Sequence, residues 1–235
     1  MRNLRSVLLA LPLSVLVLAG CIDADWEESP RGTRAEPTAT GPAVQDEFRT
    51  ALRRLQAAPY RFTADSELTV ATRITATGVH DPKAHRIART YRVTGDDPLQ
   101  AIVIGDDSYS RINDSEPWQH SSVGTFATVT GFDQKDPTGL ARFAENVTSV
   151  ERTGAHAYRG SFVLPKRSRY LPLGIPALEM TARSAGDFIA ATDQQGNIAS
   201  IGTVVRTPDL TFVMTTKFSD HGKTVTIARP KNITG

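Results

Sequence analysis

The chain has 235 residues, enough for one sizeable domain or two small ones. It contains 27 Lys and Arg residues against 25 Asp and Glu residues, a formal net charge of +2. Arg2 and Arg5 lie in the first twenty residues, which hold no acidic residue, so the remainder of the chain is neutral. A neutral chain has no basic field to attract nucleic acid, and we expect no nucleic-acid partner. An apolar content of 40% with 22% charged residues is typical of a globular domain.

Residues 1–20 have the three-part layout of a secretory signal peptide. Arg2 and Arg5 form the positive end, residues 7–18 form the apolar stretch, and small residues follow it. A helix that spans a membrane needs roughly 20 apolar residues. This stretch is about a dozen residues long, so it is too short to anchor the protein by itself.

The single cysteine, Cys21, excludes an intramolecular disulfide, a thiolate metal cluster and a two-cysteine redox couple. Residues 18–21, Leu-Ala-Gly-Cys, resemble the lipobox of bacterial lipoproteins. The resemblance implies cleavage between Gly20 and Cys21 and attachment of acyl chains, such as palmitate, to Cys21. It also implies a tether to the extracytoplasmic face of the cytoplasmic membrane, because buried acyl chains provide the anchor. The alternative is a free cysteine after an ordinary signal peptide.

Residues 22–42 are rich in Pro, Gly, Thr, Ala and charge and show no hydrophobic period. With Cys21 they are predicted to form a flexible linker between the signal peptide and the rest of the chain. No second linker and no internal repeat follow, so residues 43–235 are predicted to form a single domain. That domain begins with a helix, because Val44, Phe48, Leu52 and Leu55 recur at helical spacing before Pro59.

Most of the domain is predicted to be strand, because its segments are rich in Thr, Val, Ile and Tyr with loose alternation. The predicted strands are residues 60–70, 72–80, 84–94, 100–104, 108–112, 147–152, 155–164, 187–193, 197–206, 209–218 and 223–228. Turn sequences between them, such as Gly-Asp-Asp at 105–107, indicate hairpins and therefore an antiparallel sheet. A short helix is predicted to begin at residues 136–137. Residues 177–185 favour a short helix or a loop, and residues 121–132 are ambiguous.

Alternation in the last strands places apolar residues on one sheet face, which must be covered by helices, by a second layer or by curvature. These residues are Leu210, Phe212, Met214, Thr216 and Phe218, with Val225 and Ile227 expected to join them. Arginines recur along two earlier strands at positions 73, 86, 89 and 92. Such positions most often form a solvated sheet face, and the alternative is a stripe that binds an anionic headgroup. Trp118 is predicted either to pack in the core or to line a cavity.

Catalytic signatures in the sequence are thin. The five histidines lie far apart, and no nucleophile elbow, P-loop, HExxH or EF-hand pattern occurs. No nucleophile–base pair, metal-ligand spacing or cofactor motif is visible either. We therefore expect a protein that is not an enzyme and that has no cofactor and no metal site.

Several stretches resemble LolA-like proteins, in particular the LppX/LprAFG-type lipoproteins of actinobacteria. They are the strand–turn–strand–Trp pattern at residues 98–118, the helix start at 136–137, the hairpin at 192–198 and the final turn and strand at 218–227. The likeness covers roughly residues 43–230. It implies an α+β, mainly β fold, in which a curved antiparallel sheet, or half-barrel, is covered by the N-terminal helix and short helices.

In that family the space between sheet and helices holds acyl chains. The resemblance therefore implies a monomeric, membrane-tethered lipoprotein that binds or carries a lipid or glycolipid in the cell envelope. Phe48, Leu52, Trp118, Phe212 and Met214 are the candidate ligand-lining residues. The alternative hypothesis is a non-enzymatic module with a closed core, which binds another envelope protein.

Overall fold

The computed structural model describes residues 39–69, 71–164, 169–170, 178–179, 184–207 and 211–234. Their strands form a 13-stranded sheet built from two antiparallel meanders, and a separate pair of short strands. The first meander comprises β2 (Tyr60–Thr69), β3 (Thr72–Asp81), β4 (Arg86–Val93), β5 (Leu99–Ile104), β6 (Asp107–Ile112) and β7 (Trp118–Ser122). The second comprises β8 (Val147–Gly154), β9 (Ala157–Leu164), β12 (Ser184–Thr192), β13 (Ile198–Arg206) and β14 (Thr211–Ser219).

The two meanders join where β14 pairs with β2, so the last long strand lies beside the first. This pairing is antiparallel, with Thr216 opposite Ala64. The short strand β1 (Ala39–Thr40) extends the edge at β8, and β15 (Ile233–Thr234) pairs in parallel with β7 at the opposite edge. β10 (Arg169–Tyr170) and β11 (Leu178–Glu179) form the separate pair.

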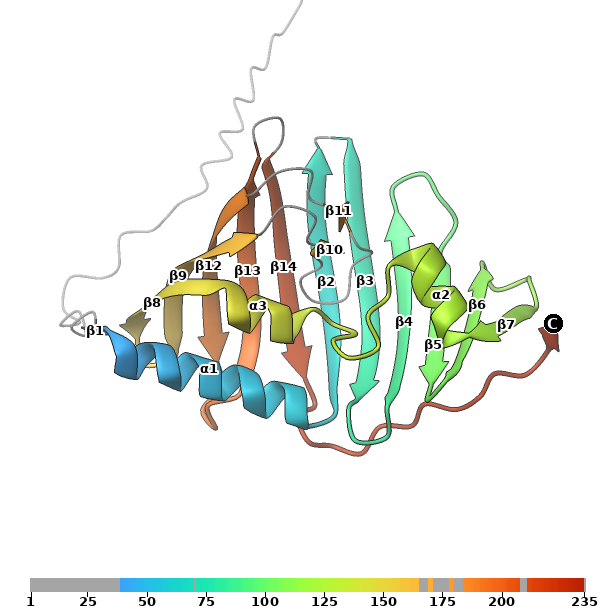
Figure 1. Cartoon of the computed structure of the whole chain (residues 1–235), viewed down its shortest axis with the longest axis horizontal. Helices are drawn as coiled ribbons and strands as arrows, with labels where there is room; N and C mark the ends of the chain where they lie inside the picture. Colours follow the sequence, from blue (N-terminus) through green and yellow to red (C-terminus); the bar gives the residue numbers. More distant parts are fainter. Residues whose placement is uncertain are drawn as a thin grey trace, which may run out of the picture. The chain divides into compact units, whose positions relative to one another are not determined.

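All three helices of the described residues lie on one face of the large sheet (Figure 1). The chain leaves the sheet at β7 and returns at β8, the other end of the strand order, so the connection has to cross the face. That connection contains α2 (Val123–Thr130) and α3 (Leu140–Asn146), and α1 (Pro42–Ala57) leads from the β1 edge to β2. We call this side the helix-covered face and the other side the outer face.

The helix-covered face carries the hydrophobic core of the described residues. The predicted α1 face is confirmed, with Phe48 and Leu52 fully buried. Phe48 stacks on Phe188 of β12 with ring centroids 5.1 Å apart, and Phe143 of α3 meets Phe188 edge-on at 5.4 Å. Aromatic rings thus fill the space between α1, α3 and the second meander.

Glycines let these rings lie flat against the sheet. Gly160 is paired with Phe188, and a Cβ at residue 160 would stand 2.6 Å from the Phe188 ring and 2.0 Å from the backbone oxygen of Ser149. Only a residue without a side chain fits there.

The predicted curved, mainly β fold is confirmed, and so are the predicted hairpins β5–β6, β8–β9 and β12–β13. The prediction of a last strand at 223–228 is wrong. β14 is already paired on both sides, by β13 and β2, and so cannot pair with the segment that follows it. That segment crosses the strand ends instead, where the backbone N–H of Gly222 donates to the oxygen of Pro59 and Arg86 donates to the oxygen of Ile227.

Three local predictions are corrected or resolved. The short helix predicted from residues 136–137 begins at Leu140, because the Asp136 carboxylate stays outside it and accepts the backbone N–H groups of Ala141 and Arg142. The ambiguous stretch 121–132 contains the end of β7 and then α2. The helix alternative for 177–185 is wrong at 178–179 and 184–185, which are strand, while most of that region and Leu210 lie outside the described residues.

Candidate functional site

A cavity of about 290 Å³ lies on the helix-covered face beneath α2, and we call it the α2 cavity. The strands β4 and β5 form its floor, and α2, the connection 131–139 and α3 form its other walls. Its large apolar and aromatic lining side chains are Tyr91, Leu99, Phe126, Val129 and Phe132, and its charged lining side chains are Arg89, Asp133, Asp136 and Arg142.

The helix α2 is short and well capped at both ends. The Ser122 hydroxyl accepts the N–H of Thr125 at 3.2 Å, and Gly131 ends the helix in the left-handed conformation, where its N–H donates to Ala127. None of its eight residues is charged. Phe126 points inward and contacts the Phe132 ring at 5.5 Å, whereas Val129 lines the cavity and is 82% exposed. The cavity therefore opens at an apolar helix edge.

Two polar side chains of β4 enter this cavity. The guanidinium of Arg89 lies 4.9 Å from the ring centroids of both Tyr91 and Phe132, and only 7% of the residue is exposed. Its Nη1 donates to the backbone oxygen of Pro137 at 3.4 Å. Its Nε and the Tyr91 hydroxyl are buried without a hydrogen-bond partner. Burial lowers the pKa of Arg89, and burial raises the pKa of Tyr91 to about 12 against the opposing effect of the Arg89 charge.

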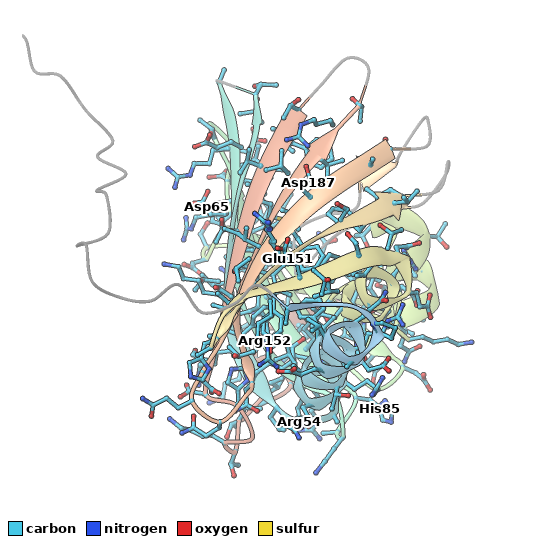
Figure 2. The ribbon with its side chains drawn as sticks, turned by 90° about the vertical axis from the view of Figure 1, so that its left-hand side faces the viewer. Arg54, Asp65, His85, Glu151, Arg152 and Asp187 are labelled. Carbon is cyan, nitrogen blue, oxygen red and sulfur yellow. The ribbon has the colours of Figure 1, made fainter. Side chains whose placement is uncertain are left out.

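A larger groove of about 720 Å³ lies on the outer face, across β8, β9, β12, β13 and β14, and we call it the outer groove. Ile189 and Val213 line it with 69% and 45% of their surface exposed. Ion pairs flank these side chains, among them Asp187 with Arg206 at 2.6 Å. Figure 2 shows Asp65, which pairs with Thr215 on this face, on the side of the sheet away from the helices.

The predicted ligand-lining residues do not all lie together. Phe48 and Leu52 of α1 and Phe212 and Met214 of β14 are buried in one core cluster on the helix-covered face. Trp118 lies on the outer face of β7, where the guanidinium of Arg111 stands 4.6 Å from its ring centroid. Whether any of the five contacts a ligand stays a prediction. Gly20 and Cys21 lie outside the described residues.

The sequence reasoning did not select Tyr91 and did not separate Arg89 from the neighbouring arginines. Arg86 and Arg92 of β4 are exposed, whereas Arg89 alternates with them and shares the buried face with Ile87 and Tyr91. The signal that could have found it was an arginine in register with apolar residues along one strand.

Other site chemistries receive no support from the described ranges. Within them, no group of three or more His, Cys, Asp or Glu side chains is placed to hold a metal ion. Within the same ranges, no helix combines the length and the apolar character that crossing a membrane requires.

No protein-family model matches the sequence, and no curated protein matches it either. Among solved structures, the lipoprotein LppX of Mycobacterium tuberculosis matches with a TM-score of 0.50 and 11% identity, over 80% of this chain and 99% of that one. The chain has the LppX-type fold. At this identity the likeness shows the fold alone. The α2 cavity and the outer groove lie on the two faces of this LppX-type sheet.

Two further solved structures match more distantly. An uncharacterised conserved protein from Thermus thermophilus matches with a TM-score of 0.37 and 10% identity, over 82% of this chain and 99% of that one. A LolA superfamily protein from Nitrosomonas europaea matches with a TM-score of 0.27 and 8% identity, over 76% of this chain and 94% of that one.

Proposed function

We propose that this protein is a membrane-tethered lipoprotein that binds or carries a hydrophobic ligand, a lipid or glycolipid, in the cell envelope. The observation that carries the proposal is the α2 cavity, an apolar space on the helix-covered face of an LppX-type sheet. Burial of an acyl chain there supplies affinity without any chemical step, and no enzymatic activity is required.

The dimensions of the site limit what it holds in this conformation. A volume of about 290 Å³ lies just below the range of about 300–1,000 Å³ for small-molecule sites. Such a volume suits an amphiphile with one chain rather than a lipid with several chains. The exposed Val129 gives a chain an apolar edge over which to enter, whereas the core beneath α1 is filled by aromatic rings.

The tether rests on the lipobox-like residues 18–21 and on Cys21, the only cysteine of the chain. Two or more acyl chains, at about 0.8 kcal/mol per buried CH₂, hold a protein stably at a membrane. Replacing Cys21→Ser should move the protein from the membrane fraction to the soluble fraction. In the unchanged protein, mass spectrometry should find an N-terminal peptide that begins at Cys21 and carries acyl chains. An unmodified Cys21 would contradict the tether and leave the ligand proposal standing.

Uptake of a neutral apolar dye tests the ligand proposal. The chain from residue 22 onward contains the whole compact unit Glu36–Gly235 and should enhance the fluorescence of N-phenyl-1-naphthylamine. Leu99→Trp adds bulk inside the α2 cavity and should reduce uptake. Ile112→Trp is the matched control, because Ile112 is paired with Leu99 and half exposed but does not line the cavity. No dye uptake, together with ligand-free organic extracts of the protein, would refute the proposal.

The outer groove supports the alternative of a non-enzymatic module that binds another envelope protein. Exposed apolar residues beside ion pairs, as around Ile189 and Val213, are typical of interaction surfaces. A photo-crosslinking amino acid at position 189 should then give a discrete protein adduct in cells, whereas one at the exposed Lys83, in the turn between β3 and β4, should not. Dye uptake that falls in Ile189→Lys but not in Leu99→Trp would instead place the hydrophobic ligand in the outer groove.

A further inference from the structure

Arg89 is a buried cation for which the described residues supply no carboxylate partner. Arginine is almost never buried in proteins unless it is paired, because removing its charge from water is costly. Among the described residues, its only hydrogen bond to a protein oxygen is the long one from Nη1 to Pro137, and its guanidinium carbon lies 4.9 Å from the centroids of two rings. These contacts orient the side chain but do not balance its charge.

Unused hydrogen-bond donors stand beside that charge. Within the part of the chain that the structure describes, the Nε–H of Arg89 and the hydroxyl of Tyr91 have no partner, and both residues are more than nine-tenths buried. They are two residues apart on β4, so both side chains project from the same face into the α2 cavity. Buried donors left unsatisfied cost free energy, and an oxygen anion would satisfy both.

The acidic residues near the cavity are engaged elsewhere. Asp133 pairs with Arg142 at 2.8 Å. Asp136 accepts two backbone N–H groups at the start of α3, and burial raises its pKa against the effect of these hydrogen bonds. Among the described residues that line the cavity, Arg89 is therefore the positive charge that remains open to a ligand.

We propose that Arg89 and Tyr91 form an anion-binding subsite in the α2 cavity, which takes the carboxylate or phosphate head of an amphiphile with one apolar chain. The proposal rests on the proposed function and adds the headgroup class to it. The chain of such an amphiphile lies against Leu99, Phe126 and Val129, the apolar part of the same cavity. A neutral ligand leaves the buried donors unpaired, so the site discriminates between charged and neutral heads.

Calorimetric titration of the chain from residue 22 onward tests this subsite. The probes are dodecanoate, dodecyl phosphate, dodecanol and inorganic phosphate. Dodecanoate and dodecyl phosphate should bind at least tenfold more tightly than dodecanol, which has the same chain without the charge. Inorganic phosphate should bind far more weakly than dodecyl phosphate, because it lacks the apolar part.

Two variants assign the effect to the subsite. Arg89→Met keeps a long side chain without charge and should weaken dodecanoate binding about 10- to 100-fold, the loss expected for a charged hydrogen-bonded pair, and leave dodecanol binding unchanged. Arg92→Met is the matched control on the exposed side of the same strand and should bind dodecanoate normally. Tyr91→Phe removes only the hydroxyl, keeps the packing, and should weaken dodecanoate binding several-fold.

The outcomes separate the two proposals. Equal binding of dodecanoate and dodecanol, with Arg89→Met unchanged, overturns the subsite and leaves the hydrophobic-ligand proposal intact. If inorganic phosphate binds as tightly as dodecyl phosphate, the proposal that the ligand is an amphiphile is overturned. The site would then be one for the free anion. Binding of no probe with a twelve-carbon chain contradicts both proposals.

Discussion

The buried histidine of β3 should make the protein less stable in mild acid. His80 faces the helix-covered side, where its ring meets the Tyr60 ring edge-on at 5.3 Å, and its Nδ1 has no partner. Burial lowers its pKa from 6.5 to about 4, although the charge of Asp81 opposes the shift. The unfolded chain therefore takes up a proton near pH 6.5, before the folded protein does.

The size of the effect follows from that difference in pKa. A histidine with a depressed folded pKa contributes stability above its unfolded pKa of 6.5, and this stability is lost as the pH falls toward 4. At about 1.4 kcal/mol per pKa unit, the full loss is about 3 kcal/mol, of which about 2 kcal/mol is already lost at pH 5. Against a total stability of roughly 5–15 kcal/mol, such a loss is easily measured.

The assay compares the protein with His80→Phe, which keeps a ring of similar shape and removes the titrating group. Urea unfolding at pH 8, 6.5 and 5, followed by circular dichroism, gives the free energy of unfolding of each. Asp136, His85, Arg86 and Lys135 line the same space as His80 and are the same in both proteins, so the comparison isolates the change at residue 80. The free energy of unfolding of the variant minus that of the unchanged protein should be about 2 kcal/mol higher at pH 5 than at pH 8. Parallel pH curves for the two proteins would refute this account of His80.

Three other predictions test the core and the two faces of the sheet. Gly160→Ala should lower the free energy of unfolding by at least about 2 kcal/mol, because its Cβ would strike a backbone oxygen and a ring. Gly154→Ala is the control and should change the free energy of unfolding by less than about 0.5 kcal/mol, because a Cβ there makes only an ordinary contact with Ala157. Phe48→Ala should cost about 3–5 kcal/mol in urea unfolding, since it removes a fully buried ring, and a smaller loss would mean that the space beneath α1 can collapse. Trp26→Phe leaves Trp118 as the single tryptophan. In this variant 12-bromododecanoate should not quench the fluorescence of Trp118, because Trp118 lies on the outer face. Quenching would support the prediction that Trp118 lines the ligand site.

The order of the elements was readable from the sequence because local patterns encode it. The helical spacing of Val44, Phe48 and Leu52 predicted α1, and alternation along 212–218 predicted which face of β14 is buried. These signals depend only on residues close in sequence, and the structure bears them out.

One failure depended on long-range pairing. Residues 223–228 contain alternating Val and Ile and are compatible with a strand, but β2, more than 140 residues earlier, already occupies the free edge of β14. This pairing is not encoded in residues 223–228, so a local pattern cannot reveal it. The start of α3 was misplaced for a different and local reason, because Asp136 acts as a cap from outside the helix rather than as its first turn.

The two halves of the sheet differ in the size of the side chains on the helix-covered face, and this difference explains where the cavity lies. The second meander and β2 place Phe162, Phe188 and Phe62 there, opposite glycines, beneath α1 and α3. On β5 and β6 one paired position on this face is small, with Ala101 opposite Ser110, and it lies between the pairs Leu99–Ile112 and Val103–Ser108. The first arrangement fills space with rings, whereas the second leaves room beneath α2 that Arg89 and Tyr91 only partly occupy. Because a filled core stabilises the fold and an open one does not, stability and ligand binding should reside in different halves of one sheet. Substitutions in the α2 cavity should accordingly change binding at little cost to folding, which is what makes Arg89 and Tyr91 testable.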